Sequence, residues 1–160
     1  GILAAIAISV LTLFYQANHP PVYALARKPG TDVFRPRLAE YVGDETIPGL
    51  LIVRTEGRMT FASAPRVSEK MRELVQEADS KVVILECGAI PDFEYTALEA
   101  LTMAEEKMRE RGVELWLAAL NPEALKVVRL SGLGQTLGSD RMFINLREAV
   151  KAYEKRGVTV

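Results

Sequence analysis

The densest group of side chains that could do chemistry lies in one short turn and the start of the helix after it: Asp92, Glu94, Tyr95, Thr96 and Glu99. Paired carboxylates serve as general acid and base when their environments separate their pKa values. A hydroxyl at a helix start can instead carry a phosphate, which the free backbone N–H groups there would bind. A purely structural interpretation also exists, because a threonine followed three residues later by a glutamate matches a capping box. The residue types alone leave these three interpretations open.

The other reactive residue types occur singly. His19 is the only histidine, and no nucleophile can be assigned to it, so it is a weak candidate for a general base. Cys87 is the only cysteine and stands in an apolar strand pattern, where a small buried residue is expected. One histidine and one cysteine effectively exclude a zinc site built from these residue types.

The segment GLGQTLG, residues 132–138, resembles a phosphate-binding glycine loop. Its spacing differs from the dinucleotide fingerprint, it follows a predicted helix rather than a strand, and it lacks the Lys-Ser/Thr pair of a P-loop. We expect it to be a loop that ends the preceding helix. The chain is therefore expected to have no catalytic residue, no cofactor-binding residue and no metal ligand, and not to be an enzyme.

A buried strand must position the acidic turn. Residues 81–88, KVVILECG, form a nearly continuous apolar run of the kind found in central strands. After the turn, apolar residues at helical spacing predict a helix over residues 95–111. Before it, residues 50–61 predict a hairpin that turns at Gly57. The acidic turn would then lie at the carboxyl end of a buried strand, where α/β sheets present ligands.

Strands and helices alternate along the rest of the chain. Further strands are predicted at residues 22–28, 113–120 and 141–146, and further helices at residues 64–78, 121–131 and 147–156. Ser63 and Asn121 are the expected caps of the first two of these helices. This order predicts an α/β fold in which a mixed, mostly parallel β-sheet is flanked by α-helices.

Residues 1–14, GILAAIAISVLTLF, carry no charge. About 14 residues of helix span roughly 21 Å, less than the ~30 Å hydrocarbon core of a bilayer. The run is apolar on nearly all sides, whereas a surface helix shows a polar face. We expect residues 1–15 to be the C-terminal part of a transmembrane helix cut by the start of the chain, which begins with glycine rather than methionine. The basic residues that follow place this side in the cytoplasm: Arg27, Lys28, Arg35 and Arg37.

Length and charge limit the domain plan and the partners. A chain of 160 residues suits one domain with an appendage. The net charge of −1 gives no basic excess for binding nucleic acid. We expect residues 16–38 to be a linker and first strand, and residues 39–160 to be a cytoplasmic domain to which the strand at 22–28 also belongs.

Residues 82–101, VVILECGAIPDFEYTALEAL, resemble the central strand, loop and helix of STAS domains, named for sulfate transporters and anti-sigma factor antagonists. In the antagonist branch the loop carries Asp-Ser-Ser-Gly, and the second serine is phosphorylated. The resemblance puts Glu94 at the aspartate and Thr96 at that serine. Tyr95 and Ala97 depart from the antagonist pattern and resemble the transporter branch, where Asp/Glu-x-Thr-Ala is common.

The amino-terminal part is similar to the exit from the last membrane helix of SulP (SLC26-type) anion transporters. There the helix leads through a basic, proline-bearing link to a strand and a Pro-Gly-Thr-x-x-[FY]-Arg turn, here residues 29–35. The resemblance extends in matching order over essentially the whole chain.

This resemblance implies a STAS fold and a non-catalytic, cytoplasmic regulatory and interaction domain of a SulP-type secondary anion transporter at the cell membrane. The anion would be of the sulfate, bicarbonate or dicarboxylate class. The implied partners are the transporter's own membrane domain, a second copy in a homodimer, and a regulatory protein or nucleotide. Thr96 would be the regulatory residue and candidate phosphorylation site, in a regulatory loop with Asp92, Glu94 and Tyr95. The alternative is a free phospho-switch protein like the anti-sigma factor antagonists, against which the apolar first segment argues.

Overall fold

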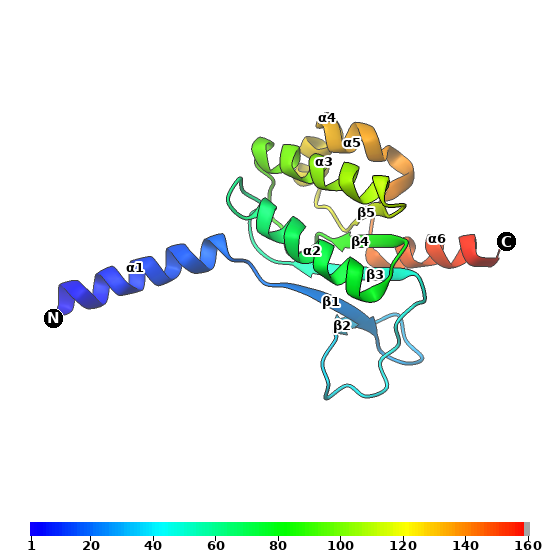
Figure 1. Ribbon diagram of the computed structural model, residues 1–160, viewed down its shortest axis with the longest axis horizontal. Helices are drawn as coiled ribbons and strands as arrows, with labels where there is room; N and C mark the ends of the chain where they lie inside the picture. Colours follow the sequence, from blue (N-terminus) through cyan, green and yellow to red (C-terminus); the bar gives the residue numbers. More distant parts are fainter. Residues whose placement is uncertain (159–160) are drawn as a thin grey trace.

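A six-stranded sheet forms the middle of the domain in the computed structural model, which describes residues 1–158 (Figure 1). The strands are β1 (Val22–Arg27), β2 (Phe34–Pro36), β3 (Leu50–Thr55), β4 (Val82–Glu86), β5 (Glu114–Ala118) and β6 (Met142–Phe143). They lie in the order β2-β1-β3-β4-β5-β6. β3 to β6 run parallel, and β1 is antiparallel to both β2 and β3. The predicted α/β class with a mixed, mostly parallel sheet is therefore confirmed.

Helices cover both faces of this sheet. One face carries α2 (Ala64–Ala78), α3 (Tyr95–Glu110), α4 (Pro122–Leu130) and α5 (Gly132–Leu137). The opposite face carries α6 (Leu146–Val158) (Figure 1). A short 3-10 helix, η1 (Ser139–Arg141), leads into β6. Helical crossovers of this kind are what parallel neighbouring strands require.

The central strand β4 divides its side chains between two hydrophobic cores. Val83 and Leu85 pack on the side of α2 to α5, whereas Val82 and Ile84 pack on the side of α6. Because successive side chains of a strand point to opposite faces, a strand buried on both faces shows no polar alternation. This arrangement explains the apolar run that precedes the acidic turn.

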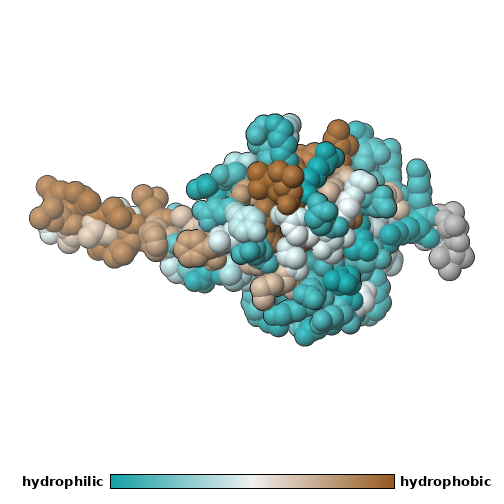
Figure 2. All heavy atoms as spheres, turned by 90° about the horizontal axis from the view of Figure 1, so that it is seen from above, coloured by the Kyte–Doolittle hydropathy of each residue, from teal (hydrophilic) through white to brown (hydrophobic). Residues whose placement is uncertain are grey.

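The helix α1 (Ile2–Asn18) extends away from the domain (Figure 1). None of its residues is buried, and Figure 2 shows it as a mostly apolar arm beside a largely polar domain. The hydroxyls of Ser9 and Thr12 donate to the carbonyls of Ala5 and Ile8, at 2.9 and 2.8 Å. Among the described residues, no helix combines the length and the apolar character needed to cross a membrane.

The hairpin predicted for residues 50–61 is wrong. After β3 the chain crosses to the segment that precedes α3 and does not return along the sheet. Gly57, whose φ of +93° suits glycine, turns the chain, and its N–H donates to the Ala89 carbonyl at 3.0 Å. Met59 then forms an isolated parallel bridge with Phe93. The physical reason is that β3 is already paired on both edges, with β1 and β4, so a returning strand has no place beside it.

The loop predicted for residues 132–138 is also wrong, because most of this segment forms the helix α5. The Ser131 hydroxyl accepts a hydrogen bond from the Gly134 N–H and so caps the start of α5. A Cβ atom at Gly134 would overlap the carbonyl oxygen of Val128 in α4. Gly134 therefore serves the close approach of two helices rather than a phosphate-binding loop.

Candidate functional site

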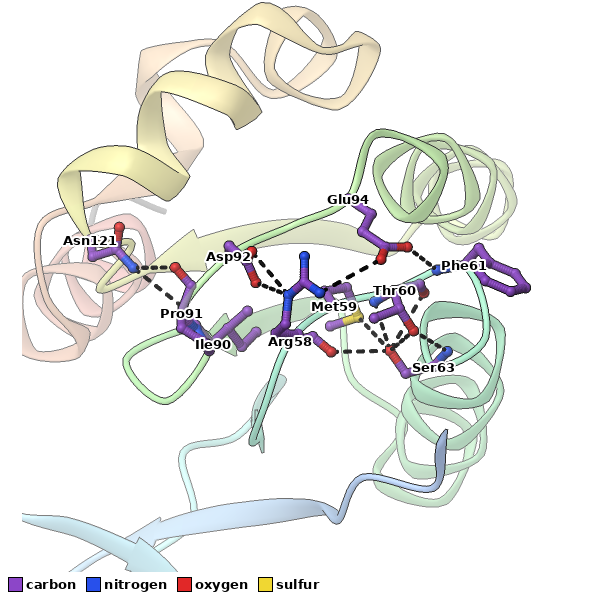
Figure 3. A network of polar contacts seen from close by, with 10 residues as sticks. All are labelled: Arg58, Met59, Thr60, Phe61, Ser63, Ile90, Pro91, Asp92, Glu94 and Asn121. Atoms are coloured by element: carbon purple, nitrogen blue, oxygen red, sulfur yellow. Dashed lines mark hydrogen bonds and ion pairs between the residues drawn. The ribbon is translucent and has the colours of Figure 1, made fainter. Parts of the chain in front are cut away.

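The acidic turn lies where the chain leaves β4 and enters α3, at the carboxyl edge of the sheet (Figure 3). Ile90 and Phe93 are buried and anchor the turn in the core. Asp92 and Glu94 are partly exposed, and the Tyr95 side chain is exposed. The turn is thus at the edge that the sequence predicted.

Arg58 connects the two acidic residues of the turn. Its Nε lies 2.8 and 3.0 Å from the two carboxylate oxygens of Asp92, and its Nη1 lies 4.0 Å from Glu94 Oε1 (Figure 3). The hydrogen bond from Arg58 to Asp92 raises the pKa of the guanidinium, which is charged at any physiological pH. The acidic cluster is therefore an ion-pair cluster completed by a cation from a segment far away in the sequence.

Residues 56–63, between β3 and α2, form a crossing segment that passes over the acidic turn. Glu94 binds this crossing segment to the start of α3. The Glu94 N–H donates to the Met59 carbonyl at 2.9 Å, and its Oε2 accepts from the Phe61 N–H at 3.1 Å. The Met59 N–H donates in turn to the Asp92 carbonyl at 3.0 Å. Residues 59–61 are thus held against the turn by backbone and side chain together (Figure 3).

The capping box predicted for Thr96 and Glu99 is wrong. α3 begins at Tyr95, so Glu94 is the N-cap residue and Thr96 is the second residue of the helix. The Leu98 N–H donates to the Glu94 carbonyl at 3.1 Å, and the Glu94 side chain makes no cap hydrogen bond to the helix. Because Glu94 is extended, with φ −72° and ψ 149°, the helix starts two residues earlier than a Thr96 cap would place it. The exposed Thr96 hydroxyl is therefore not required to hold the helix end.

Ser63 organises the crossing segment. It occupies the N-cap position of α2, as predicted, but makes no side-chain cap bond. Its buried hydroxyl accepts from the Thr60 N–H at 2.9 Å and donates to the Arg58 carbonyl at 3.3 Å (Figure 3). The bend that results leaves the Phe61 side chain 69% exposed.

Asn121 supports the turn from the other side. Its Oδ1 accepts from the Ala124 N–H at 2.9 Å, which confirms the predicted helix cap. Its Nδ2 donates to the Pro91 carbonyl at 2.9 Å and so ties the turn to the start of α4 (Figure 3).

Sequence reasoning missed Arg58 and Phe61 as members of this cluster, because it placed both in a hairpin. One signal could have found them. The apolar run of β3 ends at Val53, and the polar residues 54–58, Arg-Thr-Glu-Gly-Arg, separate it from residues 59–61. A charged residue at the end of such a polar stretch is a candidate partner for acids at the same edge of the sheet.

The singly occurring reactive residues lie outside this cluster. Cys87 is 1% exposed, and burial raises the pKa of its thiol, which disfavours the reactive thiolate. His19 lies at the end of α1, with its ring stacked on Tyr15 at a centroid distance of 3.8 Å. Within residues 1–158, no group of three or more His, Cys, Asp or Glu side chains could hold a metal ion.

Fold and cluster together define a small α/β domain that presents a loop and a helix start at the carboxyl edge of its sheet, the edge at which such domains meet ligands. The model of the STAS domain family matches residues 41–152. The chain therefore belongs to the STAS domain family, and the resemblance stated from the sequence is confirmed.

Sulfate transporters and their relatives are similar to this chain over nearly its whole length. High affinity sulfate transporter 2 of Stylosanthes hamata is 28% identical over 163 residues, covering 96% of this chain and 24% of that protein. The murine Solute Carrier 26 family member A9 anion transporter, in its inward-facing state, has a TM-score of 0.78 at 18% identity, covering 96% of this chain and 25% of that one. A sulfate transporter family protein from Wolinella succinogenes has a TM-score of 0.62 at 25% identity, covering 79% of this chain and 99% of that one. The chain spans about a quarter of the length of the curated relatives it matches.

Proposed function

We propose that this chain is the cytoplasmic regulatory and interaction domain of a SulP-type anion transporter at the cell membrane, and that it performs no chemistry of its own. The names of its relatives support this assignment, since the similarity to a sulfate transporter covers 96% of the chain. Sulfate is the transported anion that these names favour. Transport itself would take place in a membrane domain that precedes residue 1.

The exposure of α1 is the observation that carries this proposal. The helix has 17 residues, and none of them is buried against the described part of the domain. Its serine and threonine hydroxyls are satisfied by carbonyls of the same helix, as a lipid environment requires. A helix of this length spans about 26 Å, a little less than a bilayer core of ~30 Å. Residues 1–15 are then the end of a transmembrane helix, residues 16–38 the linker with the first strand, and residues 39–160 the domain.

The regulatory loop comprises Asp92, Glu94, Tyr95 and Thr96. A phosphate on Thr96 would lie in the first turn of α3, where the helix dipole and free N–H groups favour negative charge. It would also lie beside the Glu94 carboxylate and repel it. Because Glu94 holds the Phe61 N–H, this repulsion would loosen the crossing segment.

The crossing segment lies near α1, so a change in the regulatory loop could alter contacts with the proposed transmembrane helix. A hollow of about 860 Å³ lies between the two, lined on one side by Phe61, Ala62 and Arg66 and on the other by residues of α1 such as Phe14 and Tyr15. A change in the position of Phe61 would therefore alter the surroundings of Phe14 and Tyr15 at the end of α1. The transporter's own membrane domain is the partner that this geometry favours.

Two exposed aromatic residues mark the same edge as an interaction surface. Phe61 is 69% and Tyr95 68% exposed, and aromatic side chains of this kind are enriched in protein interfaces. A second copy of the transporter, a regulatory protein or a nucleotide would meet the domain here.

Flotation with phosphatidylcholine vesicles tests the membrane attachment of the intact chain. The wild-type chain is expected to float with the vesicles. The double substitution of Ile6→Asp and Leu11→Asp should abolish flotation, because each aspartate at a helix centre costs about 2.5–3.5 kcal/mol in a bilayer. Val42→Asp is the matched control, since Val42 is an exposed apolar residue of the domain. A wild-type chain that stays in the dense fraction contradicts the proposal.

A further inference from the structure

A second hollow, separate from the regulatory loop, lies at the carboxyl edge of β3 and β4 on the face covered by α6. Its volume is about 380 Å³. Its charged and polar lining comes from β3, β4, the start of α6 and the turn between β1 and β2: Arg54, Glu86, Asn145, Arg147 and Asp32. Neither the acidic turn nor the proposed regulatory function uses these residues.

Arg54 and Glu86 are direct partners in the register of β3 and β4. Both side chains belong to the α6 face, because Ile52 and Ile84, two residues before each of them, lie in the core on that side. On the α6 side, Arg54 therefore follows Ile52 along β3 and Glu86 follows Ile84 along β4, so this ion pair marks the end of the apolar core at the sheet edge.

Glu86 is incompletely satisfied although it is only 7% exposed. Its Oε1 accepts from the Gly88 N–H at 2.9 Å. Its Oε2 has an ion-pair contact with Arg54 Nη1 at 3.4 Å but no hydrogen bond within the described residues. Arg54 Nε is likewise buried without a hydrogen-bond partner in this part of the chain. Buried polar atoms of this kind are normally paired, so one acceptor and one donor next to each other point to a missing group.

A single hydroxyl would satisfy both atoms, because it can accept from Arg54 Nε and donate to Glu86 Oε2. A water molecule could do this alone. The hollow is much larger than one water, whose share of liquid volume is about 30 Å³. The hydroxyl is therefore expected to belong to a larger ligand.

The start of α6 indicates that the rest of that ligand carries negative charge. Asn145 Oδ1 accepts from the Glu148 N–H at 2.9 Å, which leaves the N–H groups of Leu146 and Arg147 for another acceptor. The positive end of the helix and the exposed Arg147 side chain attract an anion to this position. Asp32 and Glu86 balance the charges of the two arginines, and Glu86 Oε2 would repel an anion oxygen that carries no proton.

We propose that this hollow binds hydrogen phosphate, the simplest oxyanion that combines negative oxygens with a hydroxyl. The hydroxyl lies between Arg54 and Glu86, and the other oxygens face Arg147 and the first turn of α6. Sulfate has the same shape and carries no proton at neutral pH, so it leaves Glu86 Oε2 without a donor and is repelled by it. The site thus distinguishes two oxyanions by one hydrogen.

Amide chemical shifts of the intact ¹⁵N-labelled chain in lipid nanodiscs test this site, with potassium phosphate and potassium sulfate compared at equal ionic strength. The amides of Gly88, Leu146 and Arg147 should shift saturably with phosphate. They should do so at concentrations lower than for sulfate by about tenfold or more, the effect of one hydrogen bond to a charged group. Absence of a saturable shift means that a buried water alone fills the position, and this overturns the proposal, as does equal affinity for the two anions.

Two variants separate the chemistry from the fold. Glu86→Gln has nearly the same shape but presents an amide that can donate, so it should lose the preference for phosphate and bind sulfate as well. Arg147→Ala, at an exposed position, should weaken phosphate binding by about tenfold. Arg129→Ala, at an exposed position of α4, is the charge-matched control and should bind phosphate as the wild type does. A preference retained in Glu86→Gln, or equal effects of the two arginine substitutions, contradicts the site.

Discussion

The Glu94 carboxylate accepts a hydrogen bond from the backbone N–H of Phe61 at 3.1 Å, although 33 residues separate them in the sequence. Glu94 is also the N-cap residue of α3, and its own N–H is bound by the Met59 carbonyl. One residue therefore connects the start of the helix that carries Thr96 with the segment that faces α1. The regulatory proposal depends on this connection.

Glu94→Ala should release the crossing segment without unfolding the domain. The loss of one hydrogen bond to a charged acceptor is expected to lower the free energy of unfolding by about 1.5 kcal/mol. Hydrogen exchange at the Phe61 amide should become faster. Glu94→Gln keeps an acceptor oxygen and should restore most of the protection, whereas Glu99→Ala, at an exposed position of α3, should leave Phe61 as it is in the wild type. Unchanged Phe61 exchange in Glu94→Ala would show that the hydrogen bond does not hold the segment.

Gly134→Ala should be destabilising, because its Cβ would overlap the Val128 carbonyl oxygen and force α4 and α5 apart. Overpacking of this kind costs about 1–3 kcal/mol, which urea denaturation measures as a lower midpoint. Gly157→Ala is the control in α6, where a Cβ meets no atom within 4 Å. That substitution is expected to be neutral or to stabilise by up to about 1 kcal/mol. Equal midpoints for the two variants would contradict the close helix packing.

Cys87 should be protected from thiol reagents in the folded protein, because it is buried and its thiol has a raised pKa. A thiol with a higher pKa in the folded state than in the unfolded state binds its proton more tightly when folded. Its contribution to stability is therefore complete below the unfolded pKa of about 8.5 and is lost progressively as the pH rises above that value. Denaturation curves at increasing alkaline pH should show this decline. The decline should be smaller in Cys87→Ala, and an identical alkaline slope in both proteins would rule out the thiol as its source.

Periodicity in the sequence predicted α2, β4, α3, β5, α4 and α6, since each of these elements buries a continuous face, but it added a strand after β3 and missed α5. The edge of the sheet that carries the acidic turn followed from the same pattern. Arg58 could not be placed in this way, because its pairing with Asp92 depends on a chain crossing between elements that sequence periodicity does not encode. Gly134 shows the same limit, since only the close approach of two helices explains it.

Local motifs were less reliable than periodicity where tertiary contacts compete with them. Thr96 and Glu99 have the spacing of a capping box, but the pairing of Glu94 with Met59 starts the helix at Tyr95. Asn121, by contrast, accepts from the Ala124 N–H and caps α4 as the sequence predicted.

Thr96→Ala should consequently change the free energy of unfolding by no more than about 0.5 kcal/mol, as expected for an exposed position away from special contacts.

Anion uptake by the intact transporter, with substitutions at Thr96, tests the regulatory role most directly. The measurement is sulfate uptake into vesicles that contain the full-length protein, compared at equal protein content. Thr96→Glu places a negative charge beside Glu94 and should change the uptake rate by about fivefold or more relative to Thr96→Ala, the lower end of typical coupling between sites. Thr136→Ala, an exposed threonine in α5, should transport as the wild type does. Equal uptake rates for Thr96→Glu, Thr96→Ala and the wild type would contradict a regulatory switch at this loop.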